Sequence, residues 1–138
     1  MNDRYLFKAI DTNSVWRTGL LIALKGNRCA IEESDGSKWA CDAKTLCQCT
    51  SLKDKNGKLI WENDIVKKEF YTDYDNCANS EEYIGIAKIM DCAWVIETIR
   101  GHKCTRPIFE AMSYSEDVKH FEVIGNIFDN KELLESEG

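Results

Sequence analysis

Residues 48–66, QCTSLKDKNGKLIWENDIV, carry the clearest structural signals in the chain. The dipeptide Asn56-Gly57 is typical of a tight hairpin turn, because both residues tolerate the backbone angles that such a turn needs. Apolar residues around this turn are predicted to lie in the core: Leu52, Ile60, Ile65 and Val66. Short carboxylates beside turns accept hydrogen bonds from backbone N–H groups, and this is the role expected of Asp54, Glu62 and Asp64. The stretch therefore predicts a β-hairpin followed by a strand.

Strand-like patterns dominate on both sides of this stretch. On the N-terminal side, residues 15–24 and two shorter runs are separated by turn formers around Gly26 and Gly36. On the C-terminal side, residues 83–90 and 93–99 are the best strand pair, whereas the polar residues 71–82 indicate an expanded loop. The pattern predicts a mostly β fold of the α+β class. We expect a small, bent, SH3-like antiparallel barrel with flanking hairpins and a short C-terminal helix.

The length of 138 residues is enough for one domain with its own hydrophobic core. We expect a single domain over residues 1–138, with residues 1–50 as N-terminal hairpins and residues 51–138 as a barrel-like core. No apolar run is long enough to span a membrane, and the start MNDRYLFKAIDTN lacks the apolar segment of a signal peptide. These features, with 43% hydrophobic and 30% charged residues, are typical of a soluble cytoplasmic protein.

The net charge of −6 is unevenly distributed. Residues 1–61 carry a balance of +3, whereas residues 62–82 and residues 116–138 each carry −5. Non-specific phosphate binding depends on clustered Lys and Arg side chains, so direct nucleic-acid binding is not expected. The acidic segments indicate either a solvated surface or a surface that docks onto a basic partner.

Tyrosines interleave with carboxylates in the first acidic segment. Tyrosine is enriched at the centres of protein interfaces. The sequence therefore predicts a partner-binding patch formed by Tyr71, Asp73, Tyr74, Asp75, Glu81 and Glu82. A merely solvated loop is the alternative interpretation.

The chain contains seven cysteines, and an odd number in a reducing compartment argues against a disulfide framework. Four of them fall within 21 residues and could close a tetrahedral structural zinc site: Cys29, Cys41, Cys47 and Cys49. A hairpin over residues 29–41 would place Cys29 and Cys41 nearly opposite each other. The alternative cluster is Cys77, His102 and Cys104, and the alternative interpretation of all seven is buried free thiols.

Catalytic patterns are missing from the sequence. The two histidines, His102 and His120, do not belong to a nucleophile elbow, and no glycine-rich phosphate loop occurs. We therefore expect a protein that is not an enzyme.

Two separated blocks, residues 48–66 and residues 121–134 (FEVIGNIFDNKELL), resemble the YopX family of phage and prophage proteins. Members of that family repeat a block close to Q-Y-T-G-L-K-D-K-N-G-K-x-I-Y-E-G-D-I-V and close with E-V-I-G-N-I-Y-x-N-P-E-L-L. The resemblance covers almost the whole chain and implies a single YopX-like domain in a bacterial host cell. The chain departs from the family pattern at Cys49 (usually Tyr), at Ser51 and Asn63 (both usually Gly), and at Lys131 (usually Pro).

The phage-type resemblance, the acidic segments and the missing catalytic residues together favour a non-enzymatic accessory protein that binds and inhibits a host protein. The most concrete version is a counter-defence inhibitor of the anti-CRISPR type, which blocks the nucleic-acid-binding surface of a CRISPR-associated nuclease. The alternatives are a small-ligand or nucleic-acid binding module and a homo-oligomeric phage assembly protein.

Overall fold

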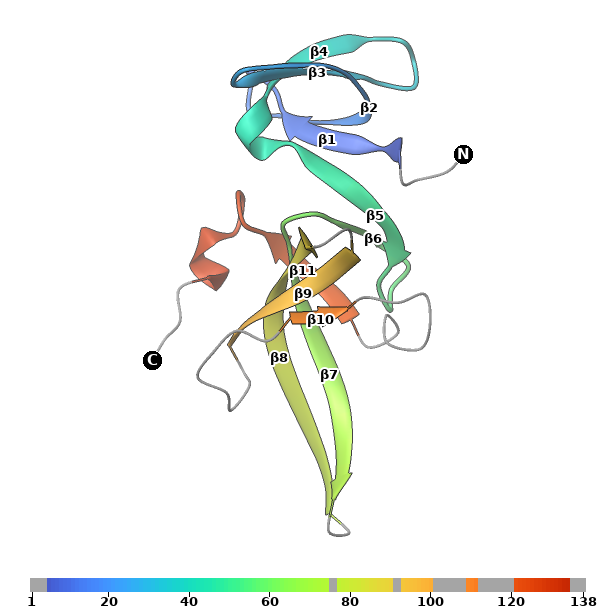
Figure 1. Cartoon of the computed structure of the whole chain (residues 1–138), viewed down its shortest axis with the longest axis vertical. Coiled ribbons are helices and arrows are strands. Elements are labelled where there is room, and N and C mark those ends of the chain that lie inside the picture. Colours follow the sequence, from blue (N-terminus) through green and yellow to red (C-terminus); the bar gives the residue numbers. More distant parts are fainter. Residues whose placement is uncertain (1–4, 75–76, 91–92, 101–108, 112–120, 135–138) are drawn as a thin grey trace. The chain divides into compact units, whose positions relative to one another are not determined.

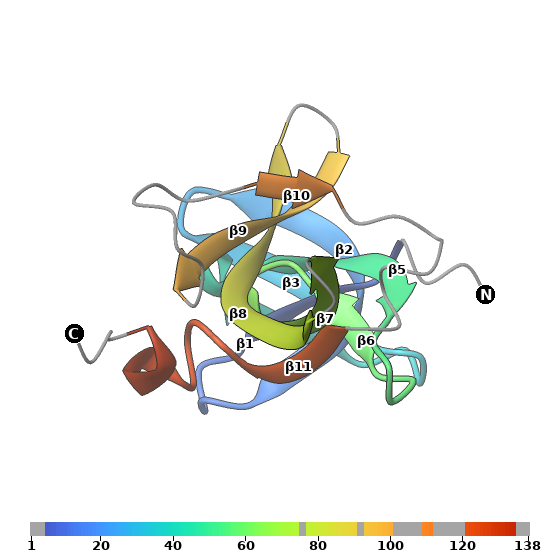
Figure 2. The ribbon, with the colours of Figure 1, turned by 90° about the horizontal axis from the view of Figure 1, so that it is seen from below.

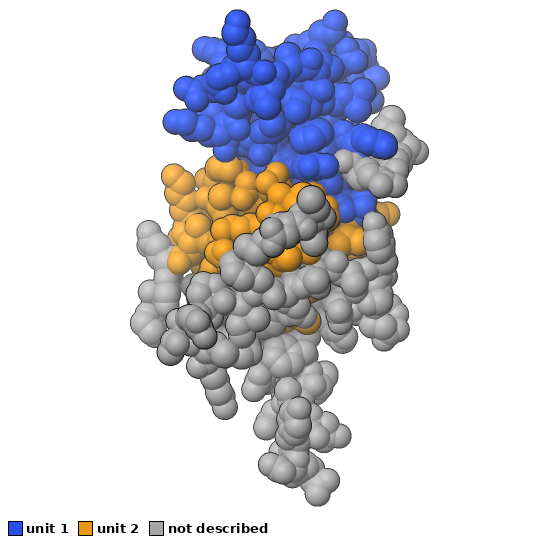
Figure 3. Space-filling model, in the orientation of Figure 1, with its two compact units in different colours: residues 1–51 blue, residues 52–138 orange. Residues whose placement is uncertain are grey.

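The computed structural model describes residues 5–74, 77–90, 93–100, 109–111 and 121–134. For residues 69–74, 77–83, 90, 93, 98, 100 and 109–111 it describes the backbone alone. The chain divides into two compact units, Met1–Ser51 and Leu52–Gly138, which Figure 3 shows in blue and orange. This division lies one residue beyond the expected sub-module boundary. Each unit is built from antiparallel strands, so the mostly β prediction is confirmed.

Unit 1 is a sheet of short strands joined by tight turns. Its strands pair in the order β4-β3-β2-β1-β5. Gly26 and Gly36, at the tips of the β2–β3 and β3–β4 hairpins, have φ values of +61° and +89°, which glycine adopts without strain. The predicted turns are therefore confirmed. The strands are β1 (Phe7–Ile10), β2 (Trp16–Lys25), β3 (Arg28–Glu32), β4 (Lys38–Asp42) and β5 (Cys47–Lys53).

The core of unit 1 lies on one face of this sheet, since side chains alternate between the two faces of a strand. Ala9 and Ile31 are fully buried there, together with Cys29 and Cys41. Partly buried side chains surround them: Phe7, Leu21, Trp39, Ala43 and Leu46.

Unit 2 begins near the end of β5. Strand β5 pairs with β6 across the Asn56-Gly57 turn, as predicted. Its main sheet has the order β10-β9-β8-β7-β11 (Figures 1 and 2). The core consists of Leu52, Ile60, Val66, Ala87, Ile96 and Phe121, with Trp94 and Val123 packed against it. The strands are β6 (Leu59–Trp61), β7 (Asp64–Tyr74), β8 (Cys77–Met90), β9 (Ala93–Arg100), β10 (Phe109–Ala111) and β11 (Phe121–Asn126).

The expectation of a loop over residues 71–82 is wrong. Strands β7 and β8 stay paired from Ile65↔Ile86 to Tyr74↔Cys77, and Figure 1 shows the two strands running together well past β9 and β11. The prediction relied on the alternation of apolar and polar residues that marks a half-buried strand. Residues 71–82 lack this alternation, although the backbone of residues 71–74 and 77–82 forms paired strands.

Two finer features of the predicted fold are also absent from the described residues. The end strands of the main sheet, β10 and β11, do not pair with each other, so the described strands form open sheets and no closed barrel. The chain after β11 makes a 3-10 turn at Lys131–Leu133 in place of the expected short helix. Asn126 Oδ1 accepts the N–H groups of Phe128 and Asp129 there, so side-chain bonding replaces a helical start.

Ser51 and Asn63 adopt left-handed backbone conformations, with φ values of +66° and +71°. A side chain in this region is strained, and Asn tolerates it better than Ser. We therefore expect Ser51→Gly to stabilise the protein by about 1 kcal/mol and Asn63→Gly by roughly half of that. Urea unfolding measures both, with Ser51→Ala as the control that retains the Cβ atom. A Ser51→Gly variant that is no more stable than Ser51→Ala would contradict strain at this position.

Candidate functional site

Asp54 joins the two sequence blocks that stand out in the chain. Its Oδ1 atom accepts the backbone N–H groups of Asn56 and Lys58, each at 2.9 Å, and so closes the hairpin turn. Its Oδ2 atom accepts the N–H group of Val123 in β11 at 2.9 Å. Asp54 is 6% exposed, so its carboxylate is largely shielded from water. This role of Asp54 is structural, as predicted, but its reach to β11 was not predicted.

Asn63 and Asp64, near the end of the 48–66 block, also make hydrogen bonds that link parts of unit 2. Asn63 N–H donates to the carbonyl of Ala87 at 2.7 Å, and its own carbonyl accepts from Ile127 at 3.1 Å. The carboxylate of Asp64 accepts the N–H group of Trp61 at 2.8 Å. The polar side chains and backbone groups of Asp54, Asn63 and Asp64 therefore have a structural role in unit 2.

The four cysteines predicted to bind zinc do not assemble into one site. Cys29 and Cys41 lie directly opposite each other across β3 and β4, as predicted, and Cys47 and Cys49 are buried in β5. Within the part of the chain that the structure describes, however, no three His, Cys, Asp or Glu side chains lie close enough to hold a metal ion. The two pairs sit on different strands, and Cys29 and Cys41 pack into the apolar core of unit 1. Of the alternative cluster, His102 and Cys104 lie outside the described residues, as does the side chain of Cys77.

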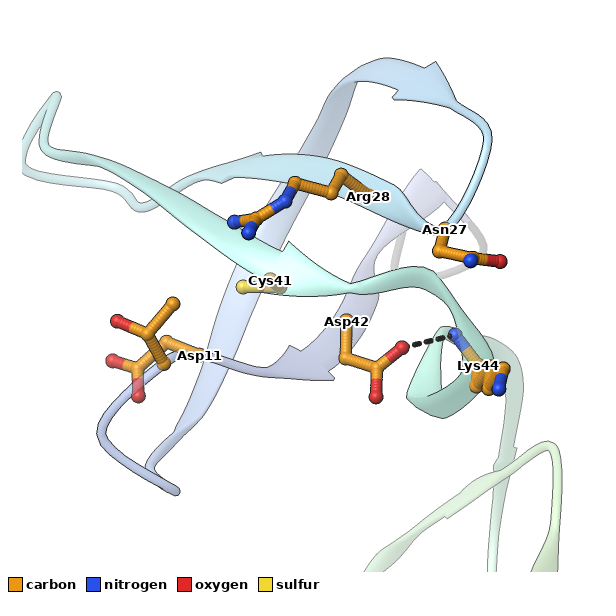
Figure 4. Close-up of a pocket in the computed structure, with 7 residues that line it drawn as sticks. Asp11, Asn27, Arg28, Cys41, Asp42 and Lys44 are labelled. Atoms are coloured by element: carbon orange, nitrogen blue, oxygen red, sulfur yellow. Dashed lines mark hydrogen bonds between the residues drawn. The ribbon is translucent and has the colours of Figure 1, made fainter.

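Unit 1 contains a pocket of about 310 Å³ beside this cysteine pair (Figure 4). The side chains of Asn27, Arg28 and Lys44 make no hydrogen bond or ion pair within the described residues, so they are available to a ligand. Cys41 also lines the pocket. Burial, with the nearby charges of Cys29 and Asp11, raises the pKa of the Cys41 thiol to about 11. The complete lining is Asp11, Thr12, Asn27, Arg28, Cys41, Asp42 and Lys44.

Asp11 is held in place by a network that the sequence did not reveal. Its carboxylate accepts Arg17 Nε at 2.8 Å and the N–H groups of Asn13 and Val15 at 2.8 and 3.0 Å. The Arg17 bond and the two N–H groups hold the pKa of Asp11 below its ordinary value. The Arg17 guanidinium also stacks on Trp39, with its central carbon 3.4 Å from the ring centroid. The carboxylate of Asp11 is therefore occupied by bonds within the protein. Asp42 is the other carboxylate that lines the pocket.

The predicted partner-binding residues lie at the far end of the β7–β8 hairpin. Tyr71, Asp73 and Tyr74 occupy β7, and Glu81 and Glu82 occupy β8. Asp75 lies outside the described residues. Among the described strands, β11 pairs with β7 only as far as Lys68, and β9 pairs with β8 only from Ile84. We call residues 69–83 the acidic ribbon, because they contain five carboxylates and no basic residue.

Comparisons with known proteins identify a family for the chain. Among the described residues, no helix has the length and apolar character needed to cross a membrane. A comparison with curated proteins finds no match. The model of the YopX family, described as "YopX protein", matches residues 8–135. Because this match covers nearly the whole chain, the protein belongs to the YopX family.

Proposed function

We propose that this protein is a non-enzymatic accessory protein of a phage or prophage that binds a host protein through the acidic ribbon. Family membership suggests a protein of phage or prophage type. The observation that carries the binding role is the ribbon itself, in which two strands pair with each other beyond the last described residues of their neighbours. An isolated two-stranded hairpin is only marginally stable in water, so a partner surface is a natural support for it.

The charge of the acidic ribbon supports a basic partner. Glu69 lies opposite Glu82 in the β7–β8 register, and like charges at opposite positions destabilise a strand pair. A partner rich in Lys and Arg would relieve this repulsion and would be attracted over a distance of about one Debye length. Among the described strands, nothing pairs with the outer edge of β7 beyond Lys68 or of β8 before Ile84, and these edges could accept a partner strand.

The nucleic-acid-binding surface of a nuclease is a basic surface of this kind. The concrete proposal is a counter-defence inhibitor of the anti-CRISPR type, in which the acidic ribbon occupies the channel of a nuclease in place of nucleic acid. Surfaces that bind phosphate groups are lined by clustered Lys and Arg side chains, and a row of carboxylates is complementary to them.

Neutralising the ribbon tests the proposed role. The variant carries Glu69→Gln, Asp73→Asn, Asp75→Asn, Glu81→Gln and Glu82→Gln. An exposed ion pair contributes about 0.5 kcal/mol, so the loss of five should weaken partner binding roughly 50- to 100-fold. Tagged protein is used to capture partners from nuclease-treated host lysate, and the affinity of the captured partner is then measured with purified components.

The second acidic segment provides a matched control. The control variant carries the same number of neutralised carboxylates outside the ribbon: Glu116→Gln, Asp117→Asn, Glu132→Gln, Glu135→Gln and Glu137→Gln. It should retain the affinity of the unmodified protein. Equal losses for both variants would mean that net charge, and not the ribbon, determines binding.

A further inference from the structure

The outer edge of β7, which faces away from β8, is open along the acidic ribbon among the described strands. Strand β11 pairs with β7 only as far as Lys68, whereas β7 continues to Tyr74. Figure 1 shows this part of β7 beyond the reach of β11. An open strand edge is a template on which an extended segment of another chain can pair.

Two hydrogen bonds of β11 show in which direction the backbone groups of β7 point. Val123 N–H donates to Asp54 Oδ2 at 2.9 Å, and the carbonyl of Phe121 accepts the N–H group of Lys55 at 2.9 Å. Both groups therefore point away from β7. Because hydrogen-bonded and non-hydrogen-bonded pairs alternate along an antiparallel ladder, Phe121 and Lys68 are a non-hydrogen-bonded pair of β11 and β7.

The same alternation continues along β7 into the acidic ribbon. The register of β7 with β8 contains no shift as far as the end of β7. Since the backbone groups of Lys68 point toward β8, those of Glu69, Tyr71 and Asp73 point to the outer edge. These three residues also share one face of the strand, because that face repeats every second residue. An added strand would therefore form its main-chain bonds with these three residues.

The identity of the three residues determines which strand fits the edge. Residues directly opposite each other in an antiparallel pair interact, and opposite charges stabilise the pair. A matching strand has Lys or Arg opposite Glu69 and opposite Asp73. A β-branched or aromatic residue suits the position opposite Tyr71. The matching pattern is thus basic, any residue, β-branched or aromatic, any residue, basic.

A second copy of this chain does not match the edge. Glu69 and Asp73 each lie two residues from Tyr71. Antiparallel pairing of two β7 edges centred on Tyr71 would therefore place Glu69 of each copy opposite Asp73 of the other. Like charges at opposite positions destabilise a strand pair. The edge consequently disfavours pairing with itself and selects a basic strand.

We propose that the outer edge of β7 binds an extended basic segment of a partner protein as an added antiparallel strand, with Lys or Arg opposite Glu69 and Asp73. This inference rests on the proposed role of the acidic ribbon and adds to it a binding mode and a sequence pattern. In such strand addition the main-chain hydrogen bonds provide affinity, and alternate side chains provide specificity.

A labelled peptide, Thr-Lys-Thr-Val-Thr-Lys-Thr, tests the pattern by fluorescence anisotropy with the full chain. Its lysines and its valine share one face of a strand. It should bind about tenfold more tightly than the isomer Thr-Thr-Lys-Val-Lys-Thr-Thr, which has the same charge but cannot place lysine opposite both carboxylates. In the double variant Glu69→Lys and Asp73→Lys, the preference should pass to the peptide with glutamates in place of the lysines. Equal affinity for the two isomers would overturn the pattern, whether or not the double variant folds.

N-methylated peptides separate strand addition from simple charge attraction. The valine N–H of the bound peptide would face β7, so N-methylation there should weaken binding about tenfold. N-methylation of an adjacent threonine removes an N–H that points away from β7 and should leave the affinity nearly unchanged. Peptide binding should also slow hydrogen exchange at the amides of Glu69, Tyr71 and Asp73.

Equal effects of the two N-methyl groups, unchanged exchange, or no binding of any peptide would overturn strand addition. None of these results would contradict the proposed function, because a basic surface could still attract the acidic ribbon without pairing to its edge. Displacement of nucleic acid from a nuclease tests that function separately, so the two proposals can fail independently.

Discussion

Asp54→Ala is expected to cost about 3–5 kcal/mol of unfolding free energy, a large part of the stability of a domain of this size. The substitution removes the acceptor for three backbone N–H groups, those of Asn56, Lys58 and Val123. Hydrogen bonds to a charged group are stronger than neutral ones and contribute about 1.5–3 kcal/mol each. Urea unfolding followed by tryptophan fluorescence measures the loss.

Two further variants separate the parts of this effect. Asp54→Asn keeps one acceptor oxygen and should cost less than Asp54→Ala. Asp35 accepts the N–H group of Ser37 in an exposed turn, so Asp35→Ala removes a local bond and should cost less than about 1 kcal/mol. If Asp54→Ala costs no more than Asp35→Ala, the carboxylate does not join the two blocks of sequence.

Gly19→Ala is the second substitution with a large expected effect. A Cβ atom at this position would lie 2.0 Å from the carbonyl oxygen of Glu32 and 3.1 Å from the Cα atom of Glu33. Because these are backbone atoms, β2 and β3 would have to move apart. We expect a loss of about 3 kcal/mol, at the upper end of the cost of overpacking.

Hydrogen exchange locates the damage within the chain. In Gly19→Ala, the amides of β2 and β3 should exchange much faster, with a smaller change in the strands of unit 2, because unit 1 has its own core. Gly26→Asn is the control, since nothing lies within 4 Å of a Cβ atom there and Asn tolerates its φ of +61°. Equal destabilisation by both substitutions would contradict the close approach at Gly19.

Local features of the fold could be predicted from the sequence because short-range chemistry determines them. The Asn56-Gly57 turn and the opposition of Cys29 and Cys41 both follow from turn residues a few positions away. The bond from Val123 to Asp54 joins residues 69 positions apart, and no local pattern indicates it. The acidic ribbon was not predicted as a hairpin because the sequence of its paired strands lacks the alternation of apolar and polar residues that indicates a half-buried strand.

The candidate sites also depend on contacts between residues that are distant in the sequence. The zinc prediction assumed that cysteines close in sequence would converge, but strand pairing brought Cys29 and Cys41 together and left Cys47 and Cys49 in another strand. The pocket combines Thr12 from the turn after β1 with Lys44 from the turn after β4. Only the folded sheet places these turns near each other, so the sequence could not reveal the pocket.

The most direct test of the proposed function is displacement of nucleic acid from a purified CRISPR-associated nuclease of the host. The unmodified protein, the neutralised ribbon variant and the control variant of residues 116–137 are titrated into the nuclease bound to labelled target DNA. We predict that the unmodified protein and the control variant release the DNA, and that release weakens as salt rises. The ribbon variant should need a roughly 50- to 100-fold higher concentration for the same release. If the unmodified protein releases no DNA at large molar excess from any nuclease of the host, or if the ribbon variant releases it equally well, the proposed role of the acidic ribbon is wrong.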